Sequence, residues 1–91
     1  MPVKVEVYTA PTCPYCPYAT RMMQEIAPSF GEDVVTEEVN TWSPEGQTRA
    51  LKHGIIAVPT IVINDKVKFV GVPRKEDLVK AIQEELRKTS L

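Results

Sequence analysis

Two cysteines, Cys13 and Cys16, stand three residues apart and are the only cysteines in the 91-residue chain. Two thiols at this spacing can close a disulfide within one turn of backbone. They follow a β-branched run ending at Tyr8 and precede an amphipathic helical pattern, so they lie at the entrance to a helix. A helix N-terminus supplies unpaired N–H groups and a partial positive charge, which favour a thiolate over a thiol. The pair is therefore interpreted as a redox-active dithiol.

Metal binding is the main competing interpretation of the cysteine pair. Four-coordinate zinc needs two ligands besides the two thiolates, and His53 is the one further Cys or His in the sequence. Redox chemistry is therefore favoured over a metal site and over a chance structural pair. We expect no metal and no cofactor other than the Cys13–Cys16 disulfide itself.

The overall composition excludes several classes of partner. Eleven basic residues against 12 acidic ones give a net charge of −1, which argues against a nucleic-acid surface. The apolar stretches are far shorter than the ~20 residues of a membrane span, so no membrane partner is expected. The first residues have neither the basic nor the apolar region of a signal peptide. We therefore expect a cytoplasmic protein. In such a reducing compartment, a cysteine pair is more often catalytic or metal-binding than part of a disulfide scaffold. The protein is also expected to be a monomer.

Hydrophobic periodicity predicts an α/β domain that spans residues 1–91. The predicted order is strand, helix, strand, helix, strand, strand, helix. The run over 55–63 is apolar at nearly every position, as expected of a central strand covered on both faces. The predicted strands are 3–9, 34–39, 55–63 and 67–70, and the predicted helices are 15–27, 43–54 and 74–88.

Three short signals mark the ends of these elements. Ser43 is predicted to cap the second helix, with Pro44 at its first position. Gly54 is predicted to end that helix in the left-handed conformation. The segment 64–66, Asn-Asp-Lys, is a turn signal that joins the last two strands in a hairpin.

The chain carries Cys13-Pro14-Tyr15-Cys16 at a strand-to-helix turn and Val58-Pro59-Thr60 about 45 residues later. In these features it resembles the thioredoxin/glutaredoxin superfamily. The resemblance covers essentially the whole chain and implies the thioredoxin fold, a mixed four-stranded sheet with helices on both faces. Segments 8–19, 54–64 and 71–73 are similar to small archaeal glutaredoxin-like thioredoxins. They are also similar to a single thioredoxin unit of the protein disulfide oxidoreductases.

The resemblance also implies roles for individual residues. Cys13 is expected to be the exposed attacking thiolate, and Cys16 the buried resolving thiol. Pro59 is expected to be a cis-proline that faces the dithiol, while the backbone of Val58 pairs with a substrate segment. The substrate-binding residues are expected to be Pro14, Tyr15, Val58, Pro59 and Thr60.

The activity implied by the resemblance is the reduction of protein disulfides through a mixed-disulfide intermediate. Such a protein serves electron transport and cell redox homeostasis. Its expected partners are disulfide-containing proteins and an electron donor that resembles thioredoxin reductase. Two alternatives stay open: a glutaredoxin that uses glutathione or a similar small thiol, and a non-enzymatic scaffold that senses oxidant or metal.

The chain departs from the patterns of both groups. Thioredoxins usually carry a buried aspartate six residues before the first cysteine, where this chain has Val7. The proton acceptor for Cys16 is therefore missing or supplied elsewhere, with Glu6 and Glu37 as candidates. The motif has the glutaredoxin form, but residues 9–12 lack the lysine that usually holds a glutathione carboxylate. Protein disulfides are therefore the favoured substrates.

Overall fold

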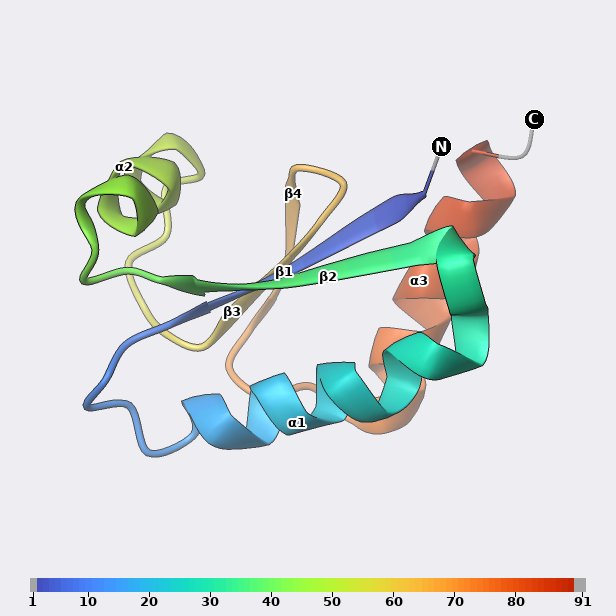
Figure 1. Cartoon of the computed structure of the whole chain (residues 1–91), viewed down its shortest axis with the longest axis horizontal. Helices are drawn as coiled ribbons and strands as arrows, with labels where there is room; N and C mark the ends of the chain where they lie inside the picture. The colour runs from blue at the N-terminus through green and yellow to red at the C-terminus, as the bar shows by residue number, and fades with distance from the viewer. Residues whose placement is uncertain (1, 90–91) are drawn as a thin grey trace.

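The structure is a computed structural model that describes residues 2–89 (Figure 1). Residues 1, 90 and 91 of the predicted domain lie outside the described part. A short 3₁₀ segment, η1, separates the first helix from the second strand. The elements are β1 (Val3–Thr9), α1 (Cys16–Ile26), η1 (Ala27–Asp33), β2 (Val34–Asn40), α2 (Pro44–Lys52), β3 (Thr60–Ile63), β4 (Lys66–Val70) and α3 (Lys75–Thr89).

The strands form a mixed sheet in the order β2-β1-β3-β4, which confirms the predicted architecture. β1 and β2 are parallel, and α1 with η1 makes the crossover that a parallel pair requires. β3 runs antiparallel to both β1 and β4. Asn64 and Asp65 both have positive φ, as the tight turn of a two-residue hairpin demands. The turn predicted between the last two strands is therefore confirmed.

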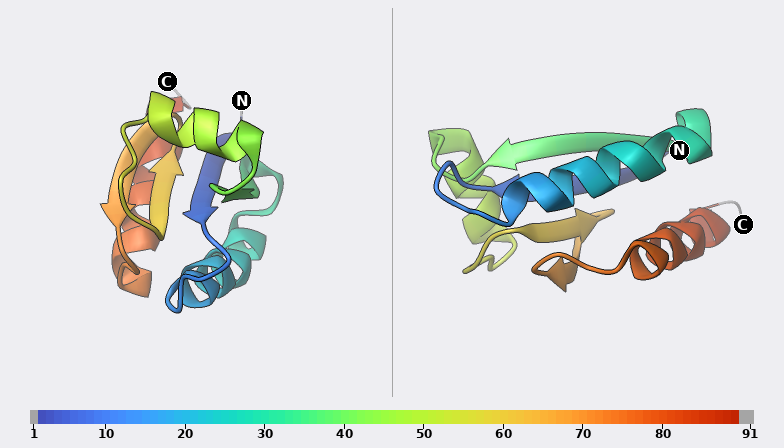
Figure 2. Two further views of the ribbon diagram at one scale, coloured as in Figure 1. Left: turned by 90° about the vertical axis from the view of Figure 1, so that its left-hand side faces the viewer. Right: turned by 90° about the horizontal axis from the view of Figure 1, so that it is seen from below.

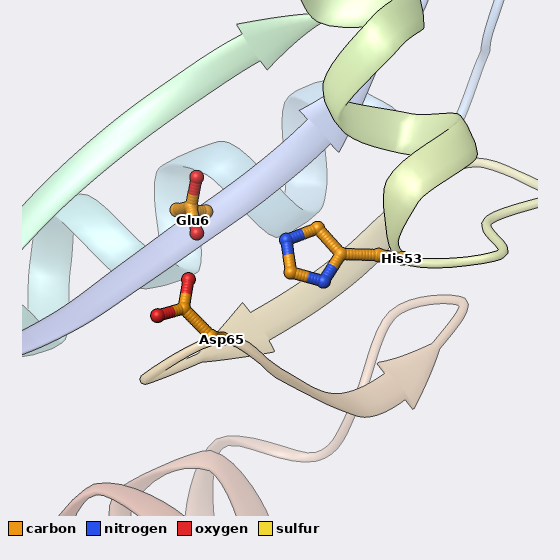
Figure 3. A group of neighbouring side chains, drawn as sticks. All are labelled: Glu6, His53 and Asp65. Carbon is orange, nitrogen blue, oxygen red and sulfur yellow. The ribbon is translucent and has the colours of Figure 1, made fainter.

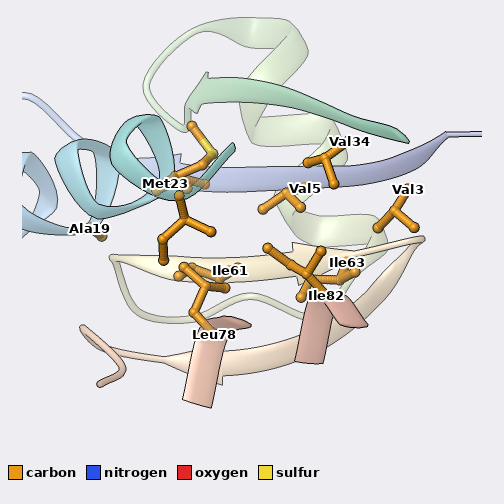
Figure 4. Close-up of a cluster of buried hydrophobic side chains, with 11 residues drawn as sticks. Val3, Val5, Ala19, Met23, Val34, Ile61, Ile63, Leu78 and Ile82 are labelled. Carbon is orange, nitrogen blue, oxygen red and sulfur yellow. The ribbon is translucent and has the colours of Figure 1, made fainter. Parts of the chain in front are cut away.

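Helices cover both faces of the sheet, with α2 on one face and α1 and α3 on the other (Figure 2). Alternation along β1 creates the two faces, because successive side chains of a strand point to opposite sides. A smaller cluster under α2 contains Tyr8, Val39, Ala50 and Val62. The larger core, shown in Figure 4, consists of Val3, Val5, Val7, Ala19, Met23, Ile26, Val34, Ile61, Ile63, Leu78 and Ile82.

The N-terminus of α2 is fixed to the end of β2 by a close backbone approach. The Ser43 hydroxyl accepts from the Gly46 N–H at 3.0 Å and donates to the Asn40 carbonyl at 2.8 Å. A Cβ atom at Gly46 would lie 1.8 Å from that carbonyl oxygen, so only glycine fits. Gly54 has φ +69°. The predicted cap and the predicted left-handed end of this helix are both confirmed.

The strand predicted over 55–63 is wrong in its first half. β3 begins only at Thr60, and the Ile56 side chain is 99% exposed. Two causes act together. Pro59 has no N–H to donate to a ladder. In addition, Thr60 already pairs with Tyr8, and only Thr9 of β1 follows that pair, so β1 has almost no residues left to pair with the segment before Thr60. The segment before β3 is therefore a loop, and it lies at the same end of the sheet as the connection between β1 and α1 (Figure 1).

Within residues 2–89, no helix has the length and apolar character needed to cross a bilayer.

Candidate active site

Cys13 and Cys16 are joined by a disulfide at the point where the loop after β1 enters α1. Their Cα atoms are 5.4 Å apart. The Cys13 N–H donates to the Ala10 carbonyl at 3.2 Å and closes a turn. Tyr15 caps the helix, and Cys16 is its first residue. Cys13 therefore lies in the turn before α1, and Cys16 lies at the first position of that helix.

The two cysteines differ in exposure. Cys16 is 4% exposed and packs beneath the turn, whereas Cys13 is partly exposed. Pro14 is exposed, and the Tyr15 side chain is 65% exposed. A macromolecular disulfide can therefore reach Cys13, with the two intervening side chains beside it.

The N-terminal end of α1 favours a thiolate near it. The first turn consists of Cys16, Pro17, Tyr18 and Ala19, so it carries no acidic side chain to compete for the unpaired N–H groups. Pro17 has no N–H, and at this position it forfeits no intrahelical hydrogen bond. The partial positive charge of the helix end is therefore available to a thiolate at the cysteine pair.

The loop before β3 lies beside the cysteine turn. The Val58–Pro59 peptide bond is cis, as the resemblance implied. Val58 and Ala10 line a common pocket of about 300 Å³, together with the exposed side chains of Trp42 and Ile56. Within residues 2–89, the backbone of Val58 makes no hydrogen bond. This backbone is therefore free to pair with an extended segment of another molecule.

Two of the predicted substrate-binding residues are buried. Pro59 is covered, and its carbonyl accepts from the Gly71 N–H at 2.7 Å. Thr60 is 1% exposed, and its hydroxyl donates to the Ala57 carbonyl at 2.6 Å. The Thr60 side chain thus braces the loop. Among the predicted substrate-binding residues of this loop, Val58 is the one whose backbone is available.

The two acids suggested as proton acceptors for Cys16 lie on the wrong face of the sheet. Arg49 of α2 binds both of them, with Glu37 at 2.8 and 3.0 Å and Glu6 in direct contact. α1 packs against the opposite face, where Val7 belongs to the apolar core. Strand alternation could have revealed this, because Glu6 shares its side of β1 with Tyr8 rather than with Val7.

A different acid, Glu38, faces the dithiol side. Glu38 and Cys16 line one groove of about 460 Å³, and the Thr20 hydroxyl donates to Glu38 Oε2 at 2.7 Å. Sequence analysis missed this residue. Both faces of β2 carry valine and acidic residues, so the alternation alone does not say which face meets α1. Glu38 lies on the same face of β2 as Val34, because the two are four residues apart in a strand. Only the burial of Val34 in the core beneath α1 shows which face this is.

Within residues 2–89, the side-chain group that could hold a metal ion does not include the cysteines. Glu6, His53 and Asp65 offer ligand atoms within 4.8 Å of one another (Figure 3). The His53 ring packs edge-on against Tyr8, on the α2 face of the sheet. His53 therefore does not join the dithiol, and Arg49 already neutralises the Glu6 carboxylate of that group.

Comparison with known families agrees with this geometry. A profile of the thioredoxin domain matches residues 3–83. The chain belongs to the thioredoxin domain family. A thioredoxin of Methanocaldococcus jannaschii is 46% identical over 84 residues, which cover 92% of this chain and 96% of the relative. A probable thioredoxin of Archaeoglobus fulgidus is 42% identical over 81 residues, covering 89% and 87% of the two chains.

A solved structure extends the likeness to three dimensions. The protein disulfide oxidoreductase of Aeropyrum pernix K1 superposes with a TM-score of 0.83 at 34% identity. The match covers 96% of this chain but only 38% of that larger protein. The predicted resemblance to the thioredoxin superfamily is thus confirmed. With the Cys13–Cys16 disulfide, family membership identifies this thioredoxin-family chain as a thiol–disulfide oxidoreductase.

Proposed function

We propose that this chain reduces disulfides in other proteins, with Cys13 as the attacking thiolate and Cys16 as the resolving thiol. The observation that carries the proposal is the disulfide between a partly exposed and a buried cysteine at a helix N-terminus. An exposed sulfur can approach a bulky substrate, whereas a buried one can attack only within the molecule.

The proposed reaction has two steps. In the reduced protein, the Cys13 thiolate attacks one sulfur of the target disulfide, so that a mixed disulfide forms and the first target thiolate leaves. Cys16 then attacks Cys13, the mixed disulfide breaks, and the second target sulfur leaves. Two electrons pass to the target, and the chain ends with the Cys13–Cys16 disulfide. Because Cys16 is three residues away, this second step is intramolecular and fast.

The substrate is proposed to lie across the cysteine turn and the loop before β3. The free backbone of Val58 can add an extended target segment by β-pairing. On the other side, Pro14 and the exposed ring of Tyr15 offer contact area next to Cys13. This arrangement suits a polypeptide better than a small thiol.

The oxidised chain must be reduced again by a two-electron donor. We assign this role to a partner enzyme resembling thioredoxin reductase, and we place the protein as a monomer in the cytoplasm. The donor would use the same exposed sulfur, because Cys16 is 4% exposed and closed to a second macromolecule.

Two activities measured side by side test the proposal. Wild type should accelerate the reduction of insulin disulfides by dithiothreitol, and Cys13→Ser should abolish this acceleration. In the variant Cys16→Ser, the mixed disulfide cannot be resolved, so a covalent adduct with insulin should accumulate on a non-reducing gel. Circular dichroism should confirm that both variants retain the fold.

The same preparations separate the alternatives. Turnover of a glutathionylated peptide without any insulin reduction would establish the glutaredoxin alternative. The absence of both activities, with metal retained in the purified protein, would favour the sensor. Equal insulin reduction by wild type and Cys13→Ser would contradict the assigned nucleophile.

A further inference from the structure

A groove lies behind the dithiol, on the α1 side of the sheet. Its volume is about 460 Å³, enough for several water molecules. The buried cysteine lines one part of the groove, and Glu38 and Asn40 of β2, one of the two edge strands, line another. The polar and sulfur-bearing residues that line it are Thr9, Cys16, Thr20, Arg21, Gln24, Glu38 and Asn40.

The carboxylate in this groove is held close to Cys16. Glu38 Oε2 accepts a 2.7 Å hydrogen bond from the hydroxyl of Thr20. Thr20 follows Cys16 by four residues in α1, and residues so spaced are neighbours on one helix face, with Cβ atoms about 5–6 Å apart. The hydrogen bond thus holds the Glu38 carboxylate at Thr20, the helical neighbour of Cys16, on the groove that Cys16 also lines.

The resolving step needs a base at this position. Cys16 must be a thiolate to attack, but burial raises the pKa of a thiol because it disfavours the charged form. Val7 is apolar, and Arg49 engages Glu6 and Glu37 on the other face of the sheet. Of the charged side chains in the described part of the chain, only Arg21 and Glu38 line the groove with Cys16. Glu38 is the one that can accept a proton.

We propose that Glu38 accepts the Cys16 proton through water in this groove during the resolving step. The proton leaves Cys16 Sγ for the Glu38 carboxylate, and the new thiolate bonds to Cys13 Sγ. The bond between Cys13 and the target sulfur breaks, and its electron pair leaves on that sulfur. Glu38 then returns the proton to the departing thiolate or to solvent. This inference rests on the proposed function, in which Cys16 resolves the mixed disulfide.

The two steps can be timed separately with the reagent dithiobis(nitrobenzoic acid). Reduced protein mixed with one equivalent releases a first coloured thiolate when Cys13 attacks, and a second when Cys16 closes the disulfide. At pH 7, Glu38→Gln should slow the second release by about 100-fold, at the low end of the range for general-base catalysis, because the base acts through water. The first release should keep its wild-type rate, since glutamine preserves an acceptor for Thr20.

The pH dependence distinguishes proton transfer from a structural effect. In Glu38→Gln, the second rate should rise nearly tenfold per pH unit, because only solvent can then ionise Cys16. The wild-type rate should depend less steeply on pH. Glu38→Asp retains a carboxylate one methylene further away, and should recover part of the rate and the shallower profile.

The matched control is Glu37→Gln, which alters the neighbouring acid on the opposite face of the same strand. It should leave both rates near wild type. An unchanged second rate in Glu38→Gln overturns the proposal, and so does an equal slowing of both steps. Loss of the first release in wild type would instead refute the proposed function, so the two failures are distinguishable. Should Glu38→Gln not fold, the profile of Glu38→Asp decides.

Discussion

Cys13 and Cys16 differ in their surroundings more than their spacing suggests. Lowering the pKa of a cysteine thiol from about 8.5 to about 7 takes roughly 2 kcal/mol of preferential thiolate stabilisation. A helix N-terminus supplies about 0.3–1 kcal/mol when exposed and up to ~2 when partly buried. The acid-free first turn of α1 can therefore supply a large part of this stabilisation, and hydrogen bonds to the thiolate must supply the remainder.

This difference in surroundings predicts that the two cysteines are alkylated at very different rates. In the folded, reduced protein, iodoacetamide should label Cys13 well before Cys16, because the reagent must reach an ionised sulfur and Cys16 is 4% exposed. Quenched samples analysed by mass spectrometry after digestion give both rates. As a control, the two labelling rates should converge in about 6 M guanidinium, which denatures most domains. Equal rates in the folded protein would contradict the assigned roles.

Among the elements, β1 contributes side chains to both faces of the sheet. Its valines face α1 and α3, while Glu6 and Tyr8 face α2. Glu6 is 2% exposed and contacts Arg49, and the Tyr8 hydroxyl donates to it at 3.3 Å. The buried acid is thus held by one cation from α2, and this pairing fixes α2 over the sheet.

Replacing Arg49 should therefore be costly. Arg49→Ala leaves the Glu6 carboxylate buried without its partner, which should lower the free energy of unfolding by about 3–5 kcal/mol. Guanidinium denaturation followed by circular dichroism measures the loss. The double variant Glu6→Leu/Arg49→Met should recover most of the stability, because no charge remains buried.

A surface ion pair provides the control for Arg49. Lys4 and Glu37 approach to 3.7 Å, but both side chains are more than 40% exposed. Lys4→Ala should therefore cost at most about 1 kcal/mol. A loss for Arg49→Ala no larger than that for Lys4→Ala would show that Glu6 does not depend on its partner.

Sequence patterns were sufficient for most of the elements and for the hairpin turn, and insufficient for features that depend on contacts between distant segments. The two-residue alternation of β1 and the cap at Ser43 are local, so residues near in sequence reveal them. The start of β3 depends on where β1 stops, and the orientation of Glu38 depends on which face of β2 meets α1. Both depend on contacts between distant segments. The apolar run before Pro59 looked buried, yet it forms a loop in which Ile56 is fully exposed and Ile55 and Val58 are only half-buried.

For the whole molecule, the layered arrangement separates two kinds of chemistry. The disulfide and its groove lie at one end of the sheet, with Glu38 on the α1 side. The charged network around Arg49 lies on the α2 side, within a face that also buries Tyr8 completely. Substitutions in that network should therefore change the free energy of unfolding without changing the rate of thiol–disulfide exchange.

Tyr8 links the stability of the whole fold to pH. Burial raises the pKa of Tyr8 above its ordinary value of 10.0, and the negative charges of Glu37 and Asp65 raise it further. The folded state thus retains the phenolic proton at pH values where the unfolded chain has lost it. The contribution of Tyr8 to stability is complete below about pH 10 and is lost as pH rises towards the folded pKa.

The measurable consequence is a steep alkaline loss of stability that depends on one hydroxyl. Above pH 10, the free energy of unfolding of wild type should fall by up to about 1.4 kcal/mol per pH unit more than that of Tyr8→Phe. The comparison cancels the titration of lysines, which both proteins share. Urea denaturation at half-unit steps from pH 8 to about 11 resolves the two slopes. Parallel curves would show that Tyr8 ionises equally easily in the folded and unfolded states.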